Sequence, residues 1–267
     1  MNSGIILMAG SGERSLLDYN KVFYDYLGKP LFIHSLDAFY NHQEIDEIVL
    51  VINPQDEQIV KTYLEFYEDI KIVYGGATRN QSLQNALKEV NSDKIIVHDA
   101  ARPSITKNDI KRIIDSLDEF DLSTLYHKVV DTIKDGRYTL NRDNLKAVTT
   151  PQGFTKKCIP LILENNQNVL DELQIFENNL EYKIGFVEET HDNKKFTNPI
   201  DFEKVDYDFK SLKQTKWLSM YMSLRGLLID ELTNKYLSNN KNITVIHLGC
   251  GLDSRCLRIK ENYKMMH

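Results

Sequence analysis

Short apolar runs alternate with amphipathic helical patterns through most of the chain, and this alternation constrains the fold more than any other feature. Aliphatic runs occur at Gly4–Met8, Glu47–Ile52, Lys71–Tyr74, Lys94–Val97 and Leu122–Tyr126. Helical patterns separate several of them, at Leu31–Tyr40, Ile59–Tyr67 and Thr106–Leu117. Strands and helices that alternate in this way form a parallel sheet with helices on both faces. The sequence therefore predicts an α/β fold built on a doubly wound, mostly parallel sheet.

A more irregular stretch interrupts the alternation at residues 129–154. It carries the turn signal Asp135-Gly136 between two extended segments, a pattern typical of a β-hairpin. We therefore expect a β-arm over these residues. Such an arm often serves dimerisation.

The pattern changes again near the carboxyl end. Trp217–Leu237 has the periodicity of a helix, and Ile243–Leu248 has the composition of a buried strand. We expect a main domain over residues 1–210 and a short α/β appendage over residues 211–267.

Composition narrows the functional classes. The 33 Lys and Arg residues against 39 Asp and Glu residues give a net charge of −6, which argues against a nucleic-acid partner. No apolar run approaches the roughly 20 residues that span a membrane, and no basic segment precedes the first run as in a signal peptide. The three cysteines, Cys158, Cys250 and Cys256, lack the spacing of a zinc site. We expect free thiols in a cytoplasmic protein.

A glycine-rich loop, Ala9-Gly10-Ser11-Gly12-Glu13-Arg14, follows the first predicted strand directly. Its glycines allow backbone N–H groups to approach phosphate oxygens, and Arg14 can bind them with a bidentate fork. The loop lacks the Gly-Lys-Ser/Thr ending of a Walker motif, and Ser15 stands where a dinucleotide fingerprint has its third glycine. Alone, the loop is as often an ordinary turn as a phosphate site. Lys21 can add a point charge, although a surface lysine is its simpler interpretation.

Further polar groups occur where other strands end. Asp99 can hold Mg²⁺ or a substrate hydroxyl, and Arg102 can bind a phosphate, but a local salt bridge explains the pair equally well. His98 has the simpler interpretation of a core histidine. The loop Gly75–Ser82 precedes a helix, and Asp192–Thr197 brings basic residues near the last strand of the sheet.

Eight of these segments, taken in order, resemble one known family. The motifs are Ala9-Gly10-x-Gly12-x-Arg14, Asn20-Lys21-x-Phe23, Gly28-Lys29-Pro30, Gly75-Gly76-x-x-Arg79-x-x-Ser82, Val97-His98-Asp99-Ala100-Ala101-Arg102-Pro103, Asp131-Thr132-Ile133-Lys134, Thr150-Pro151-Gln152-x-Phe154 and Asp192-Asn193-x-Lys195-x-Thr197. Together they resemble the 2-C-methyl-D-erythritol 4-phosphate cytidylyltransferases of non-mevalonate isoprenoid synthesis. The resemblance runs from Gly4 to about Phe209 and implies a Rossmann-like nucleotidyltransferase fold.

The resemblance implies a role for each matching residue. Those implied to bind CTP are Met8, Ala9, Gly10, Ser11, Gly12, Gly76, Ala77, Ser82 and Ala100. Those implied to bind the sugar phosphate are Asp99, Arg102, Thr132, Arg142, Thr150 and Asp192. Because the family's β-arm crosses to a second subunit, Thr132 and Arg142 would complete the partner's acceptor pocket in a homodimer.

The chemistry that the resemblance implies is transfer of CMP from CTP to 2-C-methyl-D-erythritol 4-phosphate, with release of pyrophosphate. Arg14, Lys21 and Lys195 would neutralise the charge on the reacting phosphates, together with Mg²⁺ that Asp99 is expected to bind. A phosphate monoester is already mostly ionised near neutral pH, so no dedicated general base is required.

Departures from the family leave two alternatives open. Met8 stands where an alanine is usual, Ser15 where a methionine is common, and Ala77 where an acidic residue is common. A related cytidylyltransferase that uses ribitol 5-phosphate or a similar polyol phosphate for cell-wall polymers shares most of the motifs. A degenerate nucleotide-binding scaffold is the alternative of a different class, and retention of Arg14, Lys21 and Lys195 argues against it.

The carboxyl-terminal segment resembles a second family. Tyr221–Arg258, with its run His247-Leu248-Gly249-Cys250-Gly251, is similar to the start of leucine carboxyl methyltransferases, which bind S-adenosylmethionine. One strand with one helix cannot bury its own apolar faces or complete such a pocket. We therefore expect no methyl transfer from residues 211–267.

Overall fold

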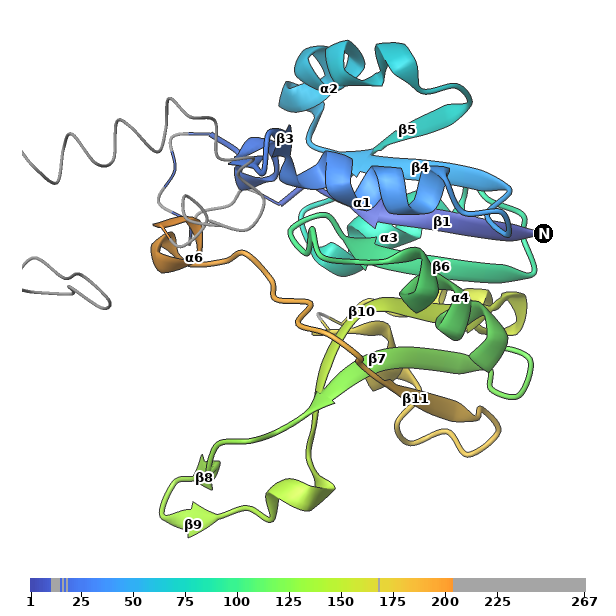
Figure 1. The fold of residues 1–267 in the computed structure, drawn as a ribbon. Coiled ribbons are helices and arrows are strands. Elements are labelled where there is room, and N and C mark those ends of the chain that lie inside the picture. The colour runs from blue at the N-terminus through green and yellow to red at the C-terminus, as the bar shows by residue number, and fades with distance from the viewer. Residues whose placement is uncertain (11–14, 16, 18, 168, 204–267) are drawn as a thin grey trace, which may run out of the picture. The chain divides into compact units, whose positions relative to one another are not determined.

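A twisted seven-stranded sheet forms the centre of the part of the chain that the structure describes (Figure 1). The computed structural model describes residues 1–10, 15, 17, 19–167 and 169–203. The strands, in spatial order, are β11 (Ile184–Glu188), β7 (Leu122–Lys128), β10 (Lys146–Thr155), β6 (Lys94–Asp99), β1 (Asn2–Leu7), β4 (Glu47–Ile52) and β5 (Ile70–Tyr74). Neighbouring strands are parallel except at β10, which is antiparallel to both β6 and β7. The predicted mostly parallel α/β sheet is confirmed.

Helices connect the strands. They are α1 (Leu31–Tyr40), α2 (Glu57–Tyr63), α3 (Arg79–Leu87), α4 (Lys107–Ser116), α5 (Ile159–Glu164) and α6 (Pro199–Glu203). Helix α4 begins at a capping box, because the Thr106 side chain accepts from the Asp109 N–H and the Asp109 carboxylate accepts from the Thr106 N–H. Two short antiparallel pairs lie outside the main sheet: β2 (Asp25–Tyr26) with β3 (Lys29–Pro30), and β8 (Lys134–Asp135) with β9 (Tyr138–Thr139).

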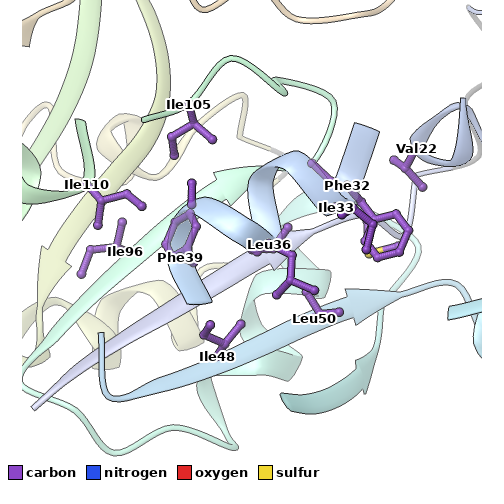
Figure 2. Close-up of a cluster of buried hydrophobic side chains, with 14 of the residues drawn as sticks. Val22, Phe32, Ile33, Leu36, Phe39, Ile48, Leu50, Ile96, Ile105 and Ile110 are labelled. Carbon is purple, nitrogen blue, oxygen red and sulfur yellow. The ribbon is translucent and has the colours of Figure 1, made fainter. Parts of the chain in front are cut away.

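One face of the sheet packs against α1 and α4. Phe32, Leu36 and Phe39 of α1 are fully buried against side chains of β4 and β6 (Figure 2). Helix α1 lies so close to β1 that a Cβ on Gly4 would lie 2.4 Å from the Phe39 ring. Glycine at this position therefore sets the distance between helix and sheet.

The opposite face packs against α3 and α5. Because side chains alternate along a strand, Ile5 of β1 joins this cluster although Ile6 belongs to the first. Leu83 of α3, Ile162 of α5 and Phe154 of β10 are fully buried in it. Cys158 is a free thiol at the same place, and burial raises its pKa to about 11. Cys250 and Cys256 lie outside the described residues.

The β-arm projects away from the sheet between β7 and β10 (Figure 1). Its tip is the β8–β9 hairpin, where Gly136 has φ of 57°, as the Asp135-Gly136 signal predicts. Strand β10 already starts at Lys146, and its second half, Gln152–Thr155, pairs with β6 inside the main sheet. The projecting part is therefore shorter than the predicted residues 129–154.

No helix in the described ranges has the length and apolar character needed to cross a membrane. The chain divides into two units after Asp206. The predicted appendage at residues 211–267 lies outside the described residues.

Candidate active site

A cleft of about 660 Å³ opens at the carboxyl ends of β1 and β6, beside the loop that follows β5. Open α/β sheets bind ligands at this edge, because the loops after successive parallel strands converge there. Its described lining comprises Leu7, Met8, Ala9, Gly10, Asn20, Lys21, Val22, Asn53, Gly76, Ala77, Thr78, Arg79, Ser82, Asp99, Ala101 and Lys195. The structure therefore brings Lys21, Asp99 and Lys195 to one cavity.

The glycine-rich loop enters the cleft from the end of β1. The Met8 N–H donates to the Val51 carbonyl at 2.9 Å, and the Met8 side chain is buried in the core below. Gly10 is exposed and has open space where a Cβ would be. Ser11, Gly12 and Arg14, to which the sequence assigns the phosphate grip, lie outside the described residues.

Asn20 fixes the segment that carries Lys21. Its side-chain oxygen accepts from the Val22 N–H at 3.4 Å and so caps the 3₁₀ helix Lys21–Phe23. Its amide donates to the Met8 carbonyl at 3.2 Å and to the Asp56 carboxylate at 2.8 Å. The lysine segment is thereby tied to the end of β1 and to the loop after β4.

The Gly75–Ser82 loop is organised by its own side chains. The Ser82 hydroxyl donates to the Thr78 carbonyl at 2.9 Å and accepts from the Gly76 N–H at 3.0 Å. The Gln81 side chain accepts from the Ala77 N–H at 3.0 Å. A Cβ on Gly75 would lie 2.3 Å from the Ala9 Cβ, so this loop and the β1 loop touch.

Four side chains of alternating charge form a row of ion pairs, and three of them, Lys195, Asp99 and Arg79, line the cleft. Lys195 Nζ donates to Asp99 Oδ2 at 2.6 Å, and Arg79 Nε donates to Asp99 Oδ1 at 3.3 Å. Arg79 Nη1 also donates to Glu172, whose carboxylate is 1% exposed. Burial, the largest influence, raises the pKa of Asp99, but Arg79 and Lys195 outweigh it and hold that pKa well below its usual range. Asp99 is therefore ionised throughout the neutral range.

Arg102 and Thr150 lie behind this row. The Arg102 guanidinium donates to the Asn193 carbonyl at 2.7 Å. The Thr150 hydroxyl accepts from the Asp99 N–H at 3.2 Å and contacts His98 Nδ1 at 3.0 Å. Burial lowers the pKa of His98 to about 4, so its imidazole is neutral at neutral pH. Neither Arg102 nor Thr150 is among the described residues that line the cleft.

Other predicted residues lie at the margin of the cleft or away from it. Ala100 is fully buried, and its neighbour Ala101 lines the cavity instead. Asp192 is exposed on the segment after β11 that also carries Lys195. Thr132 and Arg142 are exposed on the arm, where Arg142 donates to the Val130 carbonyl at 2.6 Å. A single subunit does not bring these two arm residues to its own cleft.

The described residues that line the cleft offer few ligands for a divalent cation. Asp99 is the single carboxylate among the described residues that line the cleft, and both its oxygens accept from cationic side chains. In the part of the chain that the structure describes, no three Asp, Glu, His or Cys side chains are grouped to hold a metal. The arrangement fits Mg²⁺ held chiefly by substrate phosphates. It disfavours Asp99 as a dedicated metal ligand.

Sequence reasoning gave no role to Glu172 or to Arg79. Arg79 stands in the Gly75-Gly76 motif, which is a usable signal. Glu172 lies 93 residues from Arg79 along the chain, so no local pattern links the two residues. Only the folded arrangement shows that they form one ion pair.

Comparisons with known proteins place the chain in a family. The sequence profile of the family described as 2-C-methyl-D-erythritol 4-phosphate cytidylyltransferase matches residues 3–210. A protein of that name from Bacillus velezensis is 31% identical over 210 residues, covering 74% of this chain and 90% of that protein. One from Clostridioides difficile is 35% identical over 215 residues, covering 75% and 90%.

A solved structure agrees with the sequence comparisons. The 4-diphosphocytidyl-2C-methyl-D-erythritol synthase from Anaerococcus prevotii has a TM-score of 0.69 and 30% identity, and the match covers 77% of this chain and 96% of that one. A second profile, that of leucine carboxyl methyltransferase, matches residues 181–266, as the resemblance at the carboxyl end predicts. The chain belongs to the 2-C-methyl-D-erythritol 4-phosphate cytidylyltransferase family.

Proposed function

We propose that this protein transfers CMP from CTP to 2-C-methyl-D-erythritol 4-phosphate and releases pyrophosphate. The observation that carries the proposal is the convergence of Lys21, Lys195 and two glycine loops at one cleft, in a chain that covers nearly the full length of its relatives. Both substrates are anions, and a cleft with cationic side chains at a sheet edge suits them.

The reaction is an in-line substitution at phosphorus. An oxygen of the acceptor phosphate forms a bond to the α-phosphorus of CTP, and the bond from that phosphorus to the bridging oxygen breaks. Pyrophosphate leaves with the electron pair. No proton has to be removed first, because the second pKa of a phosphate monoester is about 6. The protein positions the two phosphates and neutralises the charge on them.

Lys21 and Lys195 supply that neutralisation among the described residues, and the resemblance adds Arg14. A divalent cation held by the triphosphate oxygens would neutralise further charge during the reaction. Gly76 and Ser82 are proposed to contact the base and its sugar, with Met8, Ala9, Gly10 and Ala77 around them. Asp99 is proposed to bind an acceptor hydroxyl, and Arg102 is proposed to lie on the acceptor side.

The arm supports a proposed homodimer. Val130 and Tyr138 on the arm are largely exposed in the single chain, although both are large apolar residues. The arm also carries Thr132 and Arg142, which we propose complete the acceptor pocket of a second subunit. The cleft and the arm would then form one site from two chains.

The carboxyl-terminal segment is proposed to be non-catalytic. The leucine carboxyl methyltransferase profile matches residues 181–266 and so overlaps the cytidylyltransferase profile. We propose a main domain over residues 1–210 and no methyl transfer from residues 211–267. Calorimetric binding of S-adenosylmethionine to the whole chain would contradict this assignment. The cytoplasmic location and the lack of a nucleic-acid partner stay predictions.

Pyrophosphate release tests the proposed function. Each of the four nucleoside triphosphates is paired in turn with 2-C-methyl-D-erythritol 4-phosphate, ribitol 5-phosphate and glycerol 3-phosphate. The proposal predicts release with CTP and methylerythritol phosphate above every other pair. Release with ribitol 5-phosphate instead would assign the protein to cell-wall polymer synthesis, and no release with any pair would favour a scaffold.

A further inference from the structure

We propose that His98 is a positioning residue, which works through Thr150 to fix the turn that carries Asp99 and Arg102. This inference rests on the proposed function, because it assigns that turn to the acceptor side of the same cleft. His98 lies at the end of β6, is fully buried and does not line the cavity. It therefore acts on substrate only through its neighbours.

The turn itself is short. The Arg102 N–H donates to the Asp99 carbonyl at 3.0 Å, so the chain reverses immediately after β6. Two further backbone groups of the turn, the Asp99 N–H and the Arg102 carbonyl, contact side chains. The Asp99 N–H donates to the Thr150 hydroxyl at 3.2 Å, and the Arg102 carbonyl lies 3.1 Å from His98 Nε2.

These contacts define the direction of each hydrogen bond. A carbonyl oxygen can only accept, so His98 Nε2 carries the proton that binds Arg102. In the imidazole with one N–H, Nδ1 is then an acceptor, and it lies 3.0 Å from the Thr150 hydroxyl. Thr150 therefore donates its proton to His98 and uses its oxygen lone pair for the Asp99 N–H. A single chain of hydrogen bonds, which we call the relay, runs from Asp99 through Thr150 and His98 to Arg102.

The same turn is bonded to the segment that carries Lys195. The Asn193 amide donates to the Thr150 carbonyl at 2.6 Å, and the Arg102 guanidinium donates to the Asn193 carbonyl at 2.7 Å. Both His98 and Thr150 are at most 5% exposed, so water cannot replace a lost partner without rearrangement. The relay thus fixes β6, β10 and the segment after β11 relative to one another.

A histidine is suited to this position by its shape. The ring holds one donor and one acceptor on opposite sides of a rigid frame, and it packs against the Phe39 ring with centroids 6.0 Å apart. A substitution that keeps the volume but breaks the relay would leave buried groups unpaired. Such a substitution would displace Asp99 and Arg102, on the acceptor side, more than it would displace the glycine loops.

Two variants of Thr150 separate positioning from general stability. Thr150→Val keeps the shape but removes both hydrogen bonds, whereas Thr150→Ser keeps both. We expect Thr150→Val to lower kcat/KM for the acceptor phosphate about 10- to 100-fold, because it leaves the Asp99 N–H and His98 Nδ1 unpaired in the interior. The KM for CTP should change less than about twofold, and Thr150→Ser should stay within about threefold of the parent in both constants.

Thr124→Val is the matched control. Thr124 is a fully buried threonine of β7 whose one hydroxyl proton is shared between the Leu125 and Thr149 carbonyl oxygens, each 3.1 Å from Oγ1. Thr124→Val should lower stability as Thr150→Val does, but it should not selectively lower kcat/KM for the acceptor phosphate. Equal acceptor kinetics in Thr150→Val and Thr124→Val would overturn the proposal. Absence of turnover in the parent protein would instead refute the proposed function itself.

A spectroscopic measurement keeps the relay testable if a variant fails to fold. Long-range ¹H–¹⁵N correlation spectra of the whole, unmodified protein report which ring nitrogen of His98 is protonated. The relay predicts the neutral form with the proton on Nε2. A proton on Nδ1 alone would overturn the proposal, because the Arg102 carbonyl would then have no donor.

Discussion

The carboxylate of Asp99 and the ammonium of Lys195 lie 2.6 Å apart, although 96 residues separate them in the sequence. The pair joins the end of β6 to the segment after β11. Arg79 binds the other oxygen of Asp99. A bound phosphate could therefore pair with the Lys195 ammonium without leaving the Asp99 carboxylate unpaired. We propose that the ion pair holds Lys195 at the cleft until substrate binds, at little cost to the fold.

Replacement of Lys195 by glutamine should separate activity from stability. We expect Lys195→Gln to lower kcat about 100- to 1000-fold, as removal of one charge-stabilising donor does in other enzymes. Stability should change by less than about 1 kcal/mol, since Asp99 keeps Arg79. Steady-state pyrophosphate release and thermal unfolding measure the two effects.

The neighbouring lysine is the control for this prediction. Lys194 pairs with Asp201 at 2.5 Å and does not line the cleft. Lys194→Gln should leave turnover within about twofold of the parent. If both glutamine variants lose activity equally, Lys195 has no special role.

The Arg79–Glu172 pair should be essential to stability. Arg79→Met leaves the buried Glu172 carboxylate without its cation, and such a loss costs on the order of 3 kcal/mol. The double variant Arg79→Met/Glu172→Gln should be more stable than Arg79→Met alone, because the orphaned charge is gone. Urea unfolding of the four proteins gives the coupling energy. Additive effects would show that the pair does not interact.

The contact between the two glycine loops predicts a rescue. In Gly75→Ala the new methyl would lie 2.3 Å from the Ala9 Cβ, so the β1 loop must move. We expect a loss of about 1–3 kcal/mol in the free energy of unfolding and weaker CTP binding. Ala9→Gly removes the opposing methyl, and the double variant should recover most of the loss in calorimetric titrations. A double variant as poor as Gly75→Ala would refute the steric explanation.

The arm should control the oligomeric state. Tyr138 is 74% exposed on β9, and a charge there should prevent burial of the arm in a partner. We expect Tyr138→Asp to be monomeric in sedimentation velocity. Leu180→Asp is the control, since Leu180 is 98% exposed away from the arm. A parent protein that sediments as a monomer would contradict the proposed homodimer.

Four of the five predicted strands, β1, β4, β6 and β7, have buried side chains on both faces of the sheet, whereas β5, the fifth, is partly exposed. Strand β4 is a continuous apolar run with Val49 and Leu50 in opposite clusters, and such runs are recognisable without a structure. Strand β10 carries Thr150, Pro151 and Gln152 in its middle, so it lacks that run. Its place between β6 and β7 depends on pairing with distant strands, which no local pattern encodes.

Some features of the candidate site could likewise be predicted from the sequence, and others could not. Lys21 and Asp99 lie close to predicted strands, so the convergence of parallel strand ends brings them together. The roles of Arg79 and Glu172 arise from packing between α3 and the segment that joins α5 to β11, which the sequence could not show. Thr150, which the resemblance placed near the acceptor, forms hydrogen bonds to His98 and Asp99 inside the fold, and no local pattern shows these contacts.

Analysis of the reaction product tests the central claim most directly. The protein is incubated with CTP, Mg²⁺ and 2-C-methyl-D-erythritol 4-phosphate, and the products are identified by ³¹P NMR and mass spectrometry. The account predicts CMP joined to the acceptor through a new diphosphate bridge, with one pyrophosphate for each conjugate. Intact CTP, or hydrolysis to CMP without a conjugate, would contradict it.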